Sequence, residues 1–169
     1  MNDMTRRSFV TKSLAIGAGL TASASMGMQD TRFTPRAIKD DISLAQWALV
    51  KEVREGKWKT LDFPRIARKD FDLNGIEFVN TLFEVPTAGY LNRLKKNAAE
   101  HNVTMVLIMV DDEGETCTPS KEERKQTVIN HRKWIDIAHF LGCHAIRTNC
   151  RGPQNAPKEE ALKWAAETY

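Results

Sequence analysis

Polar side chains stand at the carboxyl ends of four apolar segments of the sequence, where they could bind a hydroxylated ligand. Gln46 and Trp47 end the first segment, and Asn80 ends the second. Side-chain amides hydrogen-bond hydroxyl groups, and an indole ring can stack on the apolar face of a sugar. We therefore expect these three residues to contact a ligand, with core packing of Trp47 and loop capping by Asn80 as the alternatives.

An acidic run, Asp111-Asp112-Glu113, follows the third apolar segment. Carboxylates placed together could bind a metal ion or share a proton. Consecutive residues point in different directions, so at most one or two of the three can face a common site. Asp111 is the member of the run that we take as a candidate for substrate binding, and a solvated loop is the simpler alternative.

The fourth apolar segment carries a cation and an amide in alternation. If Ile146 and Thr148 face helices, then Arg147 and Asn149 face the opposite side of the strand. A buried cation needs an acidic partner or a bound anion. Glu77 on the second segment has the matching parity, so we expect a Glu77–Arg147 pair, either structural or part of a binding site. Asn149 could bond a sugar hydroxyl or cap the loop that follows it.

The elements that must hold these residues alternate between strands and helices. Val103–Val110 is a nearly continuous apolar run, which is typical of a strand buried on both faces in a parallel sheet. A long helix follows, which begins at Ser120 with a Ser120–Glu123 capping box and ends at Gly142. Strands are predicted at residues 42–47, 76–80, 103–110 and 144–149. Consecutive strand–helix units of this kind predict an α/β fold with a parallel sheet.

Apolar residues at three- and four-residue steps predict which helix faces are buried. A helix over residues 90–100 has the inner stripe Tyr90, Leu91, Leu94 and Ala98. On the long helix the corresponding residues are Val128, Ile129, Ile135, Ala138 and Leu141. A final helix is predicted to turn Leu162, Ala165 and Ala166 inward.

Charge, histidines and cysteines limit the classes of site. The chain has 169 residues and a formal net charge of +3, and without a basic stripe we expect no nucleic-acid partner. The four histidines do not lie at strand carboxyl ends, so no metal site is predicted from them. Cys143 and Cys150 stand at opposite ends of a strand and cannot pair. Cys117 and Cys150 could approach each other, but two unpaired thiols are the favoured interpretation.

The first residues resemble a bacterial export signal. Arg6 and Arg7 lie in Thr5-Arg-Arg-Ser-Phe9, which is similar to the twin-arginine motif. A mild apolar stretch follows, and Ala22-Ser-Ala24 is a candidate cleavage site. We therefore divide the chain into residues 1–30, a twin-arginine signal peptide and linker, and residues 31–169. The protein is expected to be exported to the periplasm, with no membrane contact beyond export.

The order of several short motifs resembles the xylose-isomerase-like barrel superfamily. They are Ser43-Leu-Ala-Gln-Trp47, Leu61-Asp-Phe-Pro-Arg-Ile-Ala67, Gly75-Ile-Glu-Phe-Val-Asn80, Leu107-Ile-Met-Val-Asp111 and Phe140-Leu-Gly-Cys-His-Ala-Ile-Arg-Thr-Asn149. The resemblance is closest to the branch of sugar phosphate isomerases and epimerases. It implies that residues 31–169 are a partial TIM barrel, a half barrel made of the first four units of a (βα)8 barrel.

The resemblance also implies metal-assisted proton transfer on a sugar or a sugar-like polyol, which is the expected small-molecule partner. In this superfamily a divalent metal (Mn, Mg, Co or Zn) and the catalytic carboxylates are held by later strands. Catalytic residues therefore stay unassigned, and we expect no metal to bind this chain alone. Open sheet edges favour self-association. The alternatives are a non-enzymatic remnant and a metal-dependent hydrolase of the apurinic endonuclease branch.

Replacing both Arg6 and Arg7 by lysine is expected to abolish export, because the twin-arginine pathway recognises the arginine pair. The measurement is the fraction of the full-length chain recovered in the periplasm of a bacterial host. A Lys12→Arg variant, which keeps the charge of the leader, should be exported normally. Unchanged export of the double variant would show that the protein uses another route.

Overall fold

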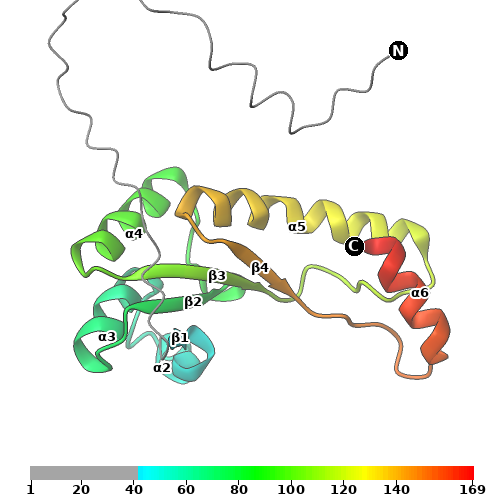
Figure 1. Ribbon diagram of the computed structural model, residues 1–169, viewed down its shortest axis with the longest axis horizontal. Helices are drawn as coiled ribbons and strands as arrows, with labels where there is room; N and C mark the ends of the chain where they lie inside the picture. The colour runs from blue at the N-terminus through cyan, green and yellow to red at the C-terminus, as the bar shows by residue number, and fades with distance from the viewer. Residues whose placement is uncertain (1–41) are drawn as a thin grey trace, which may run out of the picture. The chain divides into compact units, whose positions relative to one another are not determined.

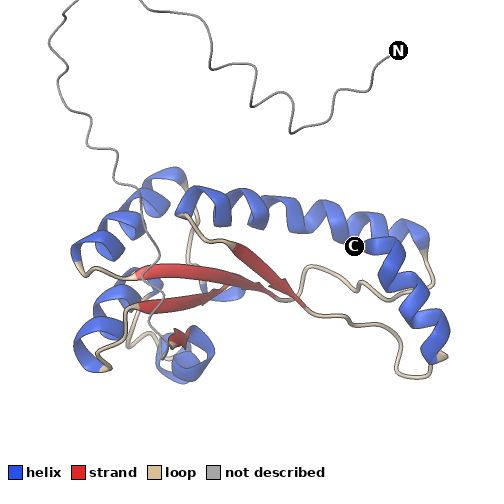
Figure 2. Ribbon diagram, in the orientation of Figure 1, coloured by secondary structure: helices blue, strands red, loops and turns tan. Residues whose placement is uncertain are grey.

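The computed structural model describes residues 42–169, which form strands alternating with helices (Figure 1, Figure 2). The strands are β1 (Ser43–Ala45), β2 (Gly75–Val79), β3 (Thr104–Val110) and β4 (Ala145–Thr148). The α-helices are α2 (Val50–Arg54), α3 (Phe63–Asp70), α4 (Ala88–Glu100), α5 (Lys121–Leu141) and α6 (Lys158–Thr168). Short 3-10 helices are η1 (Gln46–Leu49), η2 (Thr60–Asp62) and η3 (Asn80–Leu82).

The predicted export signal, with Arg6 and Arg7, lies outside the described residues. Within residues 42–169, no helix is long and apolar enough to cross a membrane.

The four strands form one parallel sheet, and their spatial order follows the sequence, β1-β2-β3-β4. Each strand is joined to the next through at least one α-helix. The prediction of an α/β fold built from consecutive parallel strand–helix units is therefore confirmed. β1 is shorter than predicted, because Gln46 and Trp47 belong to η1 and not to the strand.

Alternate residues of the strands face two different layers. On one face, Phe78 and Ile108 are fully buried in the main core, together with the inner residues of α3, α4 and α5. On the other face, Val79 and Met109 form a smaller cluster with residues of η1 and α2 packed against it. The predicted alternation is confirmed, and polar residues in phase with Val79 face the smaller cluster.

Local signals place the helix ends where the sequence predicts them. Ser120 caps α5 by accepting the N–H of Glu123 at 3.2 Å, and Gly142, with φ 85°, ends the helix in the left-handed conformation. The carboxylate of Glu123 accepts from Thr118 at 2.7 Å and does not complete the capping box. On α4 the predicted inner stripe of Tyr90, Leu91, Leu94 and Ala98 is buried.

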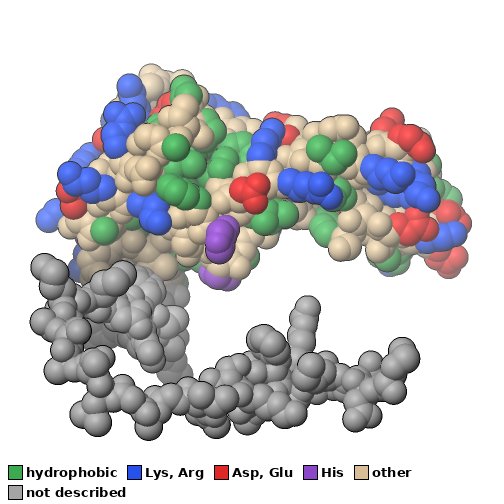
Figure 3. Space-filling model, turned by 90° about the horizontal axis from the view of Figure 1, so that it is seen from above, with side chains coloured by type: hydrophobic (Ala, Val, Ile, Leu, Met, Phe, Trp, Pro, Cys, Tyr) green, Lys and Arg blue, Asp and Glu red, His purple; other side chains and the backbone are tan. Residues whose placement is uncertain are grey.

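The buried face of α5 differs from the prediction. Val128, Ile129 and Ile135 are 36%, 52% and 50% exposed. Figure 3 shows apolar side chains among lysines and arginines on the side of the molecule where α5 lies. The residues that turn inward are instead Arg124, Thr127, His131 and Trp134, with Ala138 and Leu141 as predicted.

The loop after β3 explains this rotation of α5. Thr127 Oγ1 donates to the Glu115 carbonyl at 3.2 Å, and Trp134 Nε1 donates to the Glu113 carboxylate at 2.6 Å. Backbone and carboxylate acceptors next to a helix require polar donors on it. The first half of α5 therefore buries its polar side against a loop, and only its last turns bury apolar residues against the sheet.

Helix α6 lies beyond the carboxyl end of β4 (Figure 1). A buried guanidinium, Arg124 on α5, donates to Glu167 of α6 at 2.5 Å. Only Ala165 of α6 is buried, whereas Leu162 and Ala166, which were predicted to face inward, are exposed. The prediction is confirmed for Ala165 and wrong for Leu162 and Ala166, because α6 is held by polar contacts such as Arg124 to Glu167.

Gln46 is fully buried and joins three segments of the chain. Its Nε2 donates to Thr60 Oγ1 at 2.8 Å, and its Oε1 accepts the N–H of Val79 at 3.0 Å. Thr60 in turn donates to the Leu82 carbonyl at 2.7 Å. The amide therefore ties η1 to η2 and to the last residue of β2.

Replacing Gln46 by leucine is expected to lower the free energy of unfolding by about 1–3 kcal/mol, because the buried N–H of Val79 loses its acceptor. Leucine keeps most of the side-chain volume, so the loss reports hydrogen bonding. Urea denaturation followed by circular dichroism measures it. Gln126→Leu on the exposed face of α5 is the matched control and should change stability by less than about 0.5 kcal/mol. Equal stability of the two variants would contradict the role assigned to Gln46.

Candidate functional site

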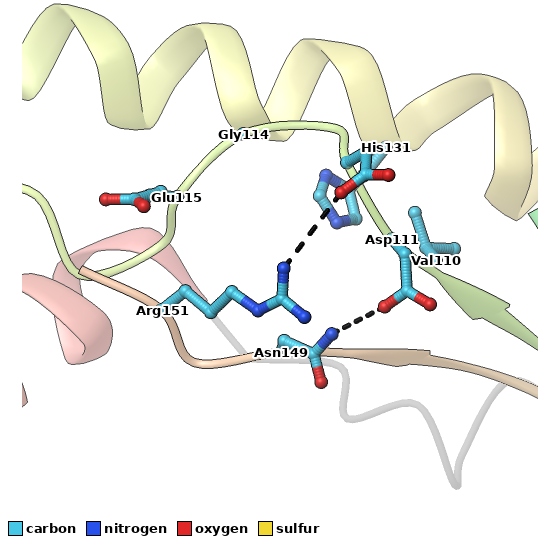
Figure 4. A pocket seen from close by; sticks show the side chains of 8 residues that line it. Val110, Asp111, Gly114, Glu115, His131, Asn149 and Arg151 are labelled. Carbon is cyan, nitrogen blue, oxygen red and sulfur yellow. Dashed lines mark hydrogen bonds and ion pairs between the residues drawn. The ribbon is translucent and has the colours of Figure 1, made fainter. Parts of the chain in front are cut away.

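A polar pocket of about 290 Å³ opens at the carboxyl ends of β3 and β4 (Figure 4). It is lined by Val110, Asp111, Asp112, Gly114, Glu115, His131, Asn149 and Arg151. The loop after β3, the middle of α5 and the segment after β4 each contribute side chains. The carboxyl edge of a parallel sheet is where ligands bind in α/β proteins, so this pocket is the candidate site.

Asn80 fixes the backbone of Asp111 at the edge of the pocket. Asn80 Nδ2 donates to the Asp111 carbonyl, and Asn80 Oδ1 accepts the Asp111 N–H, both at 2.8 Å. Asn80 is 3% exposed, and all of its bonding to Asp111 is buried. The structure therefore places Asn80 as a clamp between the ends of β2 and β3 and not as a pocket-lining residue.

Asp111, Arg147 and Asn149 form one hydrogen-bonded group. Asp111 Oδ1 accepts from Asn149 Nδ2 at 2.5 Å and from Arg147 Nη1 at 3.4 Å. Arg147 Nη1 also donates to Asn149 Oδ1 at 2.5 Å. The structure thus brings these three predicted residues together. In the ion pair, the Asp111 side chain is 9% exposed and is more buried than that of Arg147.

Glu77 does not join this group, and the predicted Glu77–Arg147 pair is wrong. The carboxylate of Glu77 instead accepts a hydrogen bond from Ser43 on β1. In the sheet register Glu77 stands opposite Leu107, whereas Arg147 stands opposite Met109, two residues further along β3. The two side chains lie on the same face of the sheet, as predicted. The register nevertheless places them at different heights on strands that are not neighbours.

Gln46 and Trp47 lie away from the pocket. The Gln46 side chain is fully buried, and both of its amide atoms bind protein groups, so a ligand cannot reach it. Trp47 packs against the smaller cluster, and the Arg54 guanidinium lies 5.5 Å from the centre of its ring. The position of Trp47 agrees with the packing alternative.

The three consecutive acids point in three directions, as the sequence predicts. Asp111 faces β4, and Asp112, with the left-handed φ of 59°, lies 4.0 Å from Arg151. Glu113 turns to α5, where it accepts from Trp134 and pairs with Lys133 at 2.8 Å. Asp111 is therefore the acid of this run that lies closest to β4.

Arg151, His131 and Glu115 line the pocket, although sequence reasoning did not select them. Figure 4 shows Arg151 reaching across the pocket toward the loop after β3, with Glu115 set apart from it. His131 Nδ1 lies 2.8 Å from the Thr127 carbonyl, which orients the ring from α5. Arg151 lies two residues after the end of a predicted strand, and this position could have indicated that it reaches the site. His131 and Glu115 carried none, because their place depends on the loop covering α5.

The described residues do not fit the divalent metal that the superfamily resemblance implies. Across residues 42–169, no three His, Cys, Asp or Glu side chains converge as a metal centre requires.

No protein-family model matches the chain. None of the curated proteins matches it either.

Replacing Asn80 by alanine is expected to lower the free energy of unfolding by about 2 kcal/mol, because two buried hydrogen bonds to Asp111 are lost. Asn80→Asp keeps an acceptor for the Asp111 N–H but not the donor, so part of the loss should remain. Thermal and urea denaturation measure both variants. Asn92→Ala on the exposed face of α4 is the control. A loss for Asn80→Ala no greater than for the control would refute the clamp.

Proposed function

We propose that this chain binds a sugar phosphate in the pocket at the ends of β3 and β4, as part of a protein of the sugar phosphate isomerase and epimerase type. We further propose that its sheet is the first four units of a (βα)8 barrel of the xylose-isomerase-like kind. The spatial order of the four parallel strands supports the second proposal. The composition of the pocket supports the first.

The observation that carries the binding proposal is the arrangement of Asp111, Asn149 and Arg151. Asp111 Oδ1 is held by Asn149 and Arg147, while no side chain within residues 42–169 donates to Oδ2. A carboxylate oxygen oriented in this way accepts hydrogen bonds from hydroxyl groups, and the second N–H of Asn149 can donate to one. A volume of about 290 Å³ suits a ligand of monosaccharide size.

Arg151 is the cation suited to a phosphate group. Its nearest acidic partner is Asp112, whose side chain is 78% exposed and 4.0 Å away. Such a solvated pair is worth little, so an incoming phosphate can replace it at small cost. Arg147, by contrast, already donates to Asp111 and Asn149. The pocket therefore offers a planar, bidentate donor for an anion beside acceptors for hydroxyls.

Proton transfer beside a carbonyl requires a base that can reach the substrate. Among the pocket carboxylates, Asp111 is engaged by Asn149 and Arg147, and Asp112 lies near Arg151. Glu115 lines the same pocket, and its carboxylate makes no hydrogen bond or ion pair with residues 42–169. Because Figure 4 shows Glu115 set apart from Asp111 and Arg151, we leave the base unassigned. Export to the periplasm and self-association remain predictions from the sequence.

Replacing Arg151 by alanine is expected to weaken binding of a hexose phosphate about tenfold or more, because a charge-assisted contact to the phosphate is lost. Binding of the same sugar without phosphate should be unchanged. Isothermal titration of the full chain with both ligands measures the difference. Arg65→Ala, which removes an exposed arginine of α3, is the matched control.

Asp111→Asn in the same titration should weaken both ligands alike, because it alters the acceptor for hydroxyl groups. If the full chain binds neither ligand, or if Arg151→Ala affects both equally, then the proposed division between phosphate and hydroxyl recognition is wrong.

A further inference from the structure

Two cysteines from segments far apart in the sequence meet at the rim of the pocket. Cys117 lies in the loop after β3, and Cys150 lies two residues beyond β4. Their Sγ atoms are 2.6 Å apart across a sequence separation of 33 residues. Both are free thiols in this structure. The sequence favoured two unpaired thiols, and in the structure the two thiols are free but in direct contact.

The backbone around the two cysteines holds them together independently of their sulfurs. The N–H of Cys117 donates to the Arg151 carbonyl at 2.7 Å, and Thr116 Oγ1 donates to the Asn149 carbonyl at 3.1 Å. Gly152 lies so close that an added Cβ would be 2.2 Å from the Cys117 carbonyl oxygen. The two segments are thus packed backbone to backbone, which only a glycine at this point permits.

We propose that Cys117 and Cys150 form a reversible disulfide that joins the loop after β3 to the segment after β4. Cys150 is exposed, whereas Cys117 is 4% exposed, so an external oxidant meets Cys150 first. The oxidant is a low-molecular-weight disulfide such as oxidised glutathione. The proposal goes beyond the proposed function and does not rest on it.

The exchange proceeds in two balanced steps. The Cys150 thiol loses its proton, and the thiolate attacks one sulfur of the external disulfide, which releases one small thiol and leaves a mixed disulfide. The Cys117 thiolate then attacks Cys150 Sγ and releases the second small thiol. The protein loses two hydrogen atoms, and the external disulfide is reduced to two thiols.

The disulfide would join the two walls of the pocket. Gly114 and Glu115 precede Cys117 on one wall, and Asn149 and Arg151 flank Cys150 on the other. In the reduced state only noncovalent contacts, hydrogen bonds and the Asp112–Arg151 ion pair, connect these walls. Oxidation therefore replaces a noncovalent contact by a covalent bond, directly beside the residues that line the pocket.

Cys143 provides an internal control. It precedes β4, at the opposite end of this strand from Cys150, so it cannot reach the pair. Burial raises the pKa of both the Cys143 thiol, to about 12, and the Cys117 thiol, so the position of Cys143 is what separates it from the pair.

The test is to equilibrate the folded full chain with oxidised and reduced glutathione and to count thiols after denaturation. Three thiols are expected in the reduced protein, and one, Cys143, in the oxidised protein. Peptide mapping should find a single crosslink, between Cys117 and Cys150. Closing a loop of this length should raise the melting temperature by on the order of 10 °C, and reductant should reverse the rise.

Variants separate the disulfide from general effects of oxidation. Cys117→Ser and Cys150→Ser should each abolish the rise, whereas Cys143→Ser should retain it. Gly152→Ala, which pushes the two segments apart, should slow crosslinking. The proposal is overturned if the oxidised chain keeps all three thiols, if the crosslink involves Cys143 or a second chain, or if the rise survives in Cys150→Ser.

Discussion

The parallel register of β2, β3 and β4 is the constraint on which the rest of the described structure depends. The register shifts between Ile76 and Glu77, so that Ile76 stands opposite Met105 but Glu77 stands opposite Leu107. This irregularity keeps Met105 and Ile108 both in the main core, although they are three positions apart and regular alternation would place them on opposite faces. The β3–β4 register has no such shift, and it pairs Val110 with Thr148, so these two strands end at the same height. The two hydrogen bonds between Asn80 and Asp111 then hold the carboxyl edge in place.

Sequence patterns predicted the α/β class and its consecutive parallel strand–helix units, because the signals for these are local. The apolar run ending at Val110 and the cap at Ser120 depend on neighbouring residues alone, and both are found where predicted. The face of α5 was not predictable in this way, because a polar loop and not the sheet covers its first half. An apolar stripe such as Val128 and Ile135 indicates burial only when the partner surface is apolar, and here the partner supplies carbonyl and carboxylate acceptors.

The sequence predicted the candidate site only in part, because only some of its residues follow from local signals. Strand ends can be read from the sequence, and they led to Asp111 and Asn149, which the structure joins by a hydrogen bond. Register cannot be read from parity, and the Glu77–Arg147 pair failed on this point. Residues that reach the pocket from outside the strands, such as His131 on α5, depend on how a loop packs on a helix. No spacing in the sequence encodes that contact.

The pocket differs from the sheet below it in what holds its walls together. β3 and β4 are joined by a hydrogen-bonded ladder that ends at Val110 and Thr148. Beyond these residues the chains diverge into a long loop and the segment leading to α6, and ladder bonding gives way to single contacts such as Cys117 to Arg151. Binding a small ligand between such walls costs conformational entropy unless they are already held in position. A crosslink at this point removes part of that cost before the ligand arrives. In the proposed scheme, the disulfide between Cys117 and Cys150 would therefore raise affinity by preorganising the pocket and not through a contact with the ligand.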